Sequence, residues 1–124
     1  MKKLTKQEAI KLHRKMWNWI ADETERTGKF CDKYEYFDVM KIPRGDCPRA
    51  LCYCCEYAIQ QNTGGFIGRC KYCPLDWDSE SDEFMCYDGK QFLEQGLFAR
   101  WKMAVDIEER VDLAREIANL REKE

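Results

Sequence analysis

Cysteines are the residues of this sequence best suited to carry chemistry, and four of the eight form two C-x-x-C pairs. Cys52 and Cys55 make the first pair, Cys70 and Cys73 make the second, and 14 residues separate the two. A C-x-x-C turn can direct two thiolates at one ion, with Zn–S distances of about 2.3 Å, and two such turns complete a tetrahedron. The spacing therefore predicts a structural Zn²⁺ site whose four positions are all filled by these cysteines.

The other four cysteines leave the ligand set open. Cys54 lies inside the first pair and Cys86 follows the second, so both are candidate substitute ligands, and Cys47 is a candidate additional ligand. Cys31 and Cys47 could also join Cys54 and Cys86 around a second ion. The alternative is that all four are buried free thiols, because free cysteine is among the most buried residue types.

The first residues bear on the redox state of these thiols. The N-terminus reads MKKLTKQEAIKLHRK, which has no apolar h-region and is not typical of a signal peptide. No apolar run approaches the roughly 20 residues needed to span a bilayer. We expect a cytoplasmic protein without a membrane segment, in which clustered thiols bind metal more often than they form disulfides. A rubredoxin-like iron site, which also uses four thiolates, is an alternative.

Helical segments on both sides of the cysteines are expected to position them. Residues 5–25 have apolar side chains on one face, begin at a Thr5/Glu8 capping box and end at Gly28. Residues 89–122 are also predicted to be helical, with a break near 103–106, where Asp106 and Glu109 repeat the capping signature.

The segment between the helices, residues 29–87, is predicted to be the metal-binding centre. It contains every cysteine and no helical period, so short strands and turns are expected, for example around 34–39 and 65–69. The predicted fold is a single domain, 1–124, of small α+β or mainly α class. In it an N-terminal amphipathic helix and a C-terminal helical pair pack around a zinc-ribbon-like centre with four cysteine ligands.

Charge and aromatic residues suggest a ligand surface beside the metal. The net charge is −2, but residues 41–71 carry five bases and two acids. Cations mixed with aromatic rings suit contact with phosphates and bases, so candidate ligand-binding residues are Arg49, Arg69, Lys71 and Tyr72. An ordinary exposed surface is the alternative interpretation. His13, the only histidine, is expected to be a half-buried, hydrogen-bonded residue rather than a ligand.

Three stretches of the chain support a resemblance to a known group of proteins. These are EAIKLHRKMWNWIA from Glu8, CEYA from Cys55 and CKYCPLDW from Cys70. They resemble small cysteine-rich proteins encoded by bacteriophages and prophages of Firmicutes, most of which have no assigned activity. The resemblance implies a phage origin and a metal bound by the two pairs, with Cys86-Tyr matching a later Cys-Tyr of the family. The extra Cys54 departs from the family pattern.

Two functions are expected from these observations. The first is a non-enzymatic, zinc-stapled accessory protein of phage origin that binds and inhibits or sequesters a host factor, such as a component of antiviral defence. Its partner would be a host protein or a nucleotide signal, contacted through the acidic residues 76–88, through Trp19 and Trp77, or near Arg69 and Lys71. The alternative is a nucleic-acid-binding zinc ribbon with a regulatory role. A catalytic metal needs an open coordination position, and four thiolates leave none.

Overall fold

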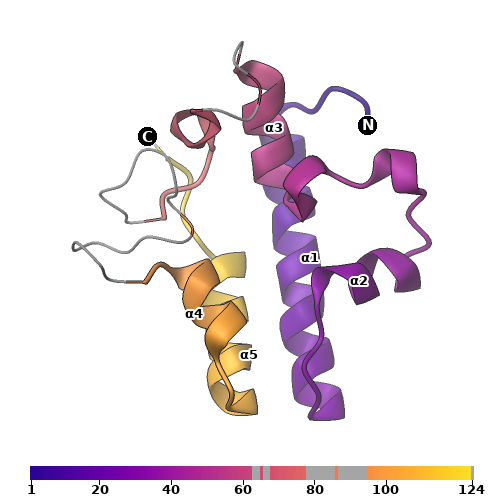
Figure 1. Ribbon diagram of the computed structural model, residues 1–124, viewed down its shortest axis with the longest axis vertical. Helices are drawn as coiled ribbons and strands as arrows, with labels where there is room; N and C mark the ends of the chain where they lie inside the picture. The colour runs from indigo at the N-terminus through magenta and orange to yellow at the C-terminus, as the bar shows by residue number, and fades with distance from the viewer. Residues whose placement is uncertain (63–64, 66–67, 78–85, 87–94, 124) are drawn as a thin grey trace.

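The computed structural model describes residues 1–62, 65, 68–77, 86 and 95–123. Within these residues the fold is mainly helical, as predicted, and the β-type pairing seen there is an isolated antiparallel bridge between Leu75 and Glu122. The α-helices are α1 (Lys6–Thr27), α2 (Lys33–Val39), α3 (Tyr53–Gln61), α4 (Leu97–Met103) and α5 (Ile107–Ala118), and three short 3₁₀ helices are η1 (Arg44–Asp46), η2 (Arg49–Leu51) and η3 (Arg69–Tyr72) (Figure 1).

The predicted N-terminal helix is confirmed as α1, with both of its ends as expected. The Thr5 hydroxyl accepts a hydrogen bond from the Glu8 N–H at 3.1 Å, and the Glu8 carboxylate accepts one from the Thr5 N–H at 3.0 Å. This reciprocal pair satisfies two N–H groups at the helix start that have no partner within the helix. At the other end Gly28 has φ of 68°, a left-handed conformation that glycine adopts without strain.

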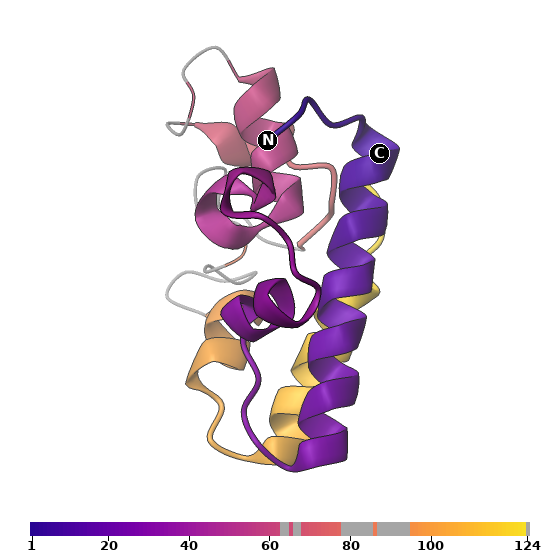
Figure 2. The same cartoon turned by 90° about the vertical axis from the view of Figure 1, so that its right-hand side faces the viewer.

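Helices α1 and α5 lie side by side and antiparallel, and they form the longest packed pair of the molecule (Figures 1 and 2). Their facing side chains are buried, among them Met16, Trp17 and Ile20 of α1 and Ala114 and Ile117 of α5. Apolar burial of this kind is the main favourable term in folding. The apolar stripes seen in the sequence are the faces that are buried here, although the sequence analysis expected them to pack around the cysteine centre rather than against each other.

The break before α5 is also confirmed, and α4 ends there. Asp106 caps α5 by accepting from the Glu109 N–H at 3.1 Å. The Arg110 guanidinium, stacked 4.3 Å from the Trp101 ring, donates to the carbonyl oxygens of Trp101 and Ala104 at 3.0 and 3.3 Å. The Trp101 carbonyl also accepts from the Ala104 N–H at 3.3 Å, so these bonds together satisfy carbonyls at the end of α4. The predicted helical start at 89–94 lies outside the described residues.

The middle of the chain differs from its prediction. Residues 34–39, expected as a strand, belong to α2, which Asp32 caps by accepting from the Glu35 N–H at 3.0 Å. Residues 53–61, where no helix was expected, form α3. Both helices are too short to show a helical period of apolar residues. Their capping residues were therefore the sequence feature that could have indicated them.

The C-terminal residues return to the cysteine-bearing segment. The Lys123 N–H donates to the Pro74 carbonyl at 2.7 Å, and the Asp76 N–H donates to the Arg121 carbonyl at 3.0 Å. The Arg121 side chain also pairs with the Asp76 carboxylate at 2.7 Å. Residues 74–76 are thus joined to 121–123 although they lie far apart in the sequence. Among the described helices none is both long and apolar enough to cross a bilayer.

Candidate metal centre

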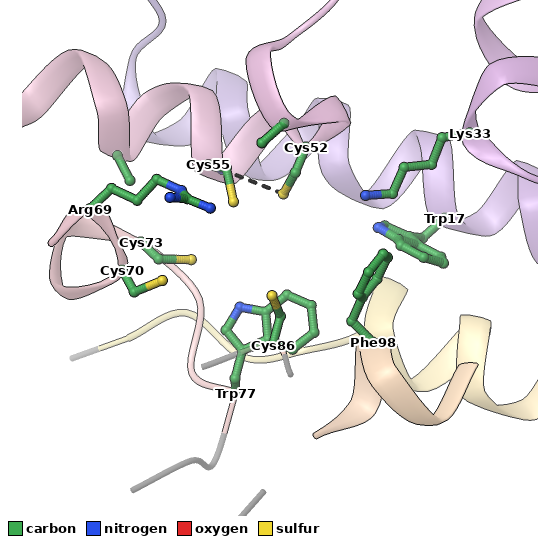
Figure 3. A pocket seen from close by; sticks show the side chains of 12 residues that line it. Trp17, Lys33, Cys52, Cys55, Arg69, Cys70, Cys73, Trp77, Cys86 and Phe98 are labelled. Carbon is green, nitrogen blue, oxygen red and sulfur yellow. Dashed lines mark hydrogen bonds between the residues drawn. The ribbon is translucent and has the colours of Figure 1, made fainter. Parts of the chain in front are cut away.

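The four cysteines of the predicted site line one pocket between α1, α3, η3 and α4 (Figure 3). The cavity has a volume of about 100 Å³. Its lining also includes Cys86, a substitute ligand in the sequence analysis, and two cations, Lys33 and Arg69. The aromatic rings of Trp17, Trp77 and Phe98 close the remaining side. The site thus collects residues that lie far apart in the sequence.

The first pair is fixed by the start of α3. Cys52 is the N-cap residue of this helix, and its sulfur accepts a hydrogen bond from the Cys55 N–H at 3.4 Å. The Cys55 thiol is the main cause that lowers the pKa of Cys52 well below its ordinary value, while contact with Cys52 raises the pKa of Cys55. Within this pair Cys52 is therefore the sulfur that carries negative charge most readily.

The second pair is carried by η3 and by the extended residues that follow it. Gly68, at φ of 74°, makes the turn into η3, Cys70 lies within this helix and Cys73 is its C-cap residue. The pKa of Cys73 is lowered, first by contact with Cys54 and also by the Leu75 N–H and the Trp77 side chain. Backbone N–H donation to Cys52 and to Cys73 stabilises the thiolate form that binds metal.

The remaining cysteines fall into two groups. Cys54 is fully buried, its sulfur lies 3.9 Å from the Ala9 carbonyl, and contact with Cys73 raises its pKa. Burial raises the pKa of Cys86 to about 12. Cys31 and Cys47 are not in the pocket lining, and their thiols donate to the carbonyls of Lys29 and Pro43. Cys54 and Cys86 therefore lie at or beside the site, whereas Cys31 and Cys47 lie away from it.

Lys33 was missed by the sequence analysis. Its side chain is buried, and its ammonium lies 4.4 Å from the centre of the Phe98 ring and 5.5 Å from that of Trp17. Cation–π attraction holds the charge beside the pocket, where it contributes to the lowered pKa of Cys52. Nothing in the sequence around Lys33 distinguished it, because its role depends on rings supplied by α1 and α4.

The four predicted ligand-binding residues lie in different surroundings. Arg49 pairs with the buried carboxylate of Glu56 at 2.8 Å, and Arg69 points into the cysteine pocket. Tyr72 is 40% exposed, with the Lys71 ammonium 5.3 Å from its ring centre.

Trp77, which was expected to offer an exposed ring to a partner, is only 7% exposed because it packs against the pocket. The acidic residues 76–88, which were also expected to contact a partner, lie mostly outside the described residues.

The side chains that the structure describes do not form a complete metal shell. In the part of the chain that the structure describes, no group of three or more His, Cys, Asp or Glu side chains has the geometry to hold a metal ion. The contacts are instead Cys52 with Cys55 and Cys54 with Cys73. In chemical terms the pocket offers five thiols, two of which ionise readily, beside two cations.

Comparison of the chain with protein-family models, with curated proteins and with solved structures gave no match.

Proposed function

We propose that this protein is a zinc-stapled binding protein without catalytic activity, in which Cys52, Cys55, Cys70 and Cys73 hold one Zn²⁺. The observation that carries the proposal is that these four side chains, from two separate segments, line one cavity of about 100 Å³. Backbone N–H groups donate to Cys52 and Cys73, one sulfur of each pair. Convergence of two C-x-x-C turns on one space is what a four-coordinate zinc site requires.

Zinc binding would require the cysteine side chains to move from this arrangement. Rotation of the cysteine side chains between staggered positions would exchange the sulfur–sulfur hydrogen bonds for bonds to the ion. Zinc binds thiolates, so the thiol protons would be released. The charges of Arg69 and Lys33 at the cavity wall would then offset part of the negative charge of the thiolates.

A site of this kind suits a structural role. Four protein ligands leave no position for substrate or for an activated water. The elements it would join are short, since α2 has seven residues, α3 has nine and η3 has four. Helices of this length have little stability alone. The zinc would therefore stabilise a surface, and we propose that this surface binds the partner.

The proposed partner is a host factor, which the protein would inhibit or sequester. The support is the resemblance of three stretches of the sequence to small phage-encoded cysteine-rich proteins, given above. With Trp77 buried, α2 offers two exposed apolar side chains, Tyr34, which is 64% exposed, and Val39, which is 60% exposed. These two side chains are the first candidates for contact with a protein partner.

The experiment has two arms. Elemental analysis of the purified protein should find about one zinc per chain, and a metal-free protein of unchanged stability would refute the staple. Tagged protein should then capture a specific host protein from lysate, and the Tyr34→Ala/Val39→Ala variant should capture less. A Lys11→Ala variant, changed at an exposed residue of α1, serves as the control. If extraction yields a bound nucleotide instead, the partner is a nucleotide signal.

A second candidate function is a regulatory zinc ribbon that binds nucleic acid. One observation favours it: Lys71 and the exposed ring of Tyr72 lie together directly before Cys73. A cation beside an exposed ring suits contact with a phosphate and an unstacked base. Binding should then weaken steeply as salt rises. Absence of binding to single-stranded DNA and RNA at low salt would exclude this candidate.

A further inference from the structure

His13 is the one histidine of the chain, and its surroundings fix which ring nitrogen carries a proton. Its residue exposure is 0%, so the expectation that it would be half-buried was wrong. Nε2 lies 2.9 Å from the Ile117 carbonyl oxygen. Because a carbonyl oxygen only accepts hydrogen bonds, Nε2 must be the donor. In the neutral ring Nδ1 then has a free lone pair.

Nδ1 is buried and has no hydrogen-bond partner among the residues that the structure describes. A buried polar atom in this state needs an explanation, because burial without a partner is costly. The ring lies behind the cysteine pocket, with its centre 6.4 Å from that of Trp17 and 6.2 Å from that of Trp77, both of which line the cavity. The ring that carries this nitrogen therefore packs against two residues of the pocket lining.

One sulfur beside His13 can be identified. The His13 side chain is in close contact with the side chain of Cys52. Nε2 is already bonded to Ile117 on the α5 side. The nitrogen that faces Cys52 is then Nδ1.

We propose that His13 Nδ1 and Cys52 Sγ bind the same zinc ion, so that the metal has three sulfur ligands and one nitrogen ligand. This inference rests on the proposed zinc staple and changes the composition of its ligand shell. A histidine that binds metal almost always donates its other ring N–H to a carboxylate or a backbone carbonyl, which is what His13 does with Ile117.

Charge gives a second reason for this shell. Zinc with four thiolates has a net charge of about −2, whereas zinc with three thiolates and a neutral imidazole has about −1. In a cavity lined largely by buried residues the smaller charge costs less to remove from water. The nitrogen ligand would also join α1 and α5 to the metal, since Ile117 orients the ring.

X-ray absorption at the zinc edge of the wild-type protein tests the inference without any variant. The expected result is a shell of three sulfurs and one nitrogen. A shell of four sulfurs overturns the assignment of His13 and leaves the proposed staple intact. If the protein binds no zinc, both the proposed structural zinc site and the assignment of His13 as its ligand are overturned.

Variants give an independent measure. His13→Ala should lower zinc affinity, measured by competition with a chromophoric chelator, by at least about 100-fold, the upper end of the loss caused by removing an outer-shell partner. His13→Cys should restore most of the affinity with a four-sulfur shell. Ile20→Val, a buried change on the same helix, is the matched control for lost packing and should leave affinity unchanged. Unchanged affinity in His13→Ala would overturn the inference.

Discussion

The two sides of this molecule are stabilised in different ways. Helices α1 and α5 have 22 and 12 residues, and they bury long apolar stripes against each other. The side that carries α2, α3 and η3 is built of short helices, tight turns and hydrogen bonds to sulfur. We therefore expect the first side to be stabilised mainly by apolar burial and the second to depend more on the proposed zinc ion. Four predictions test this contrast.

Removal of the proposed metal should have the largest effect on stability. The effect should be confined to the side of the molecule that carries α2, α3 and η3. Structural zinc sites contribute about 10–16 kcal/mol of apparent binding free energy, which is also folding free energy. We expect chelation, or Cys52→Ser, to abolish amide protection in α3 and η3 while α1 and α5 stay protected. Hydrogen exchange followed by mass spectrometry measures both sides at once.

Cys31→Ser is the matched control, because Cys31 is buried but does not line the pocket. Equal protection of α3 with and without metal would show that the cysteine side is stable by itself, contrary to the contrast drawn above.

Shortening a side chain between α1 and α5 should affect the whole molecule. Ile117 is fully buried, and Ile117→Ala should cost about 2–5 kcal/mol of unfolding free energy through lost contacts and a cavity. Urea denaturation measures this cost. Val105→Ala, at a residue 87% exposed, should change stability by less than about 0.5 kcal/mol. If only α5 lost protection in Ile117→Ala, the two sides would be less coupled than their packing suggests.

Glu56 is expected to have an intermediate effect, confined to the cysteine side. Its carboxylate is buried and accepts from the Arg49 side chain at 2.8 and 3.1 Å, from the Arg49 N–H at 2.8 Å and from Gln60 at 2.9 Å. Glu56→Gln removes the charge and one or more of these bonds, at a cost of about 1–3 kcal/mol. Thermal denaturation of the zinc-bound protein measures the loss. Glu108→Gln, on the exposed side of α5, should be neutral.

The smallest effect is expected at the ion pair between Lys6 and Glu122, whose N···O distance is 2.8 Å. Hydrogen bonds from Lys6 and then Gln7 lower the pKa of Glu122 below 4.5. The unfolded chain therefore takes up this proton at higher pH than the folded one, so the contribution is present above about pH 4.5 and is lost as pH falls through the folded pKa. The Tm difference between wild type and Glu122→Gln should be small at about pH 7 and should decrease further as the pH falls below about 4.5. A Tm difference that increased as the pH was lowered would contradict the predicted direction of this pH dependence.

The sequence predicted the helical side much better than the cysteine side. The Thr5/Glu8 capping box, Gly28 and the apolar stripes are local signals, and each matched the structure. The short helices α2 and α3 were missed because seven and nine residues show no clear period, and the sulfur that caps α3 belongs to a cysteine already assigned to metal.

The candidate site divides in the same way. Spacing along the chain predicted that the two cysteine pairs would lie together, and they line one pocket. Lys33 and His13 could not be found from spacing, because each acts through a neighbour from another helix: Phe98 of α4 in one case and the Ile117 carbonyl of α5 in the other. Sequence reasoning thus found the local part of the site and missed the part made by packing.

The link between residues 74–76 and 121–123 has a consequence for synthesis on the ribosome. Cys70 and Cys73 emerge well before Arg121 and Lys123, whose backbone groups hold the segment after Cys73. At translation rates of about 5–20 residues per second, the nearly 50 residues between them take roughly 2–10 s to make. During that interval the backbone hydrogen bonds that hold the segment after Cys73 cannot form. The final position of the second cysteine pair therefore depends on residues that are made after α5.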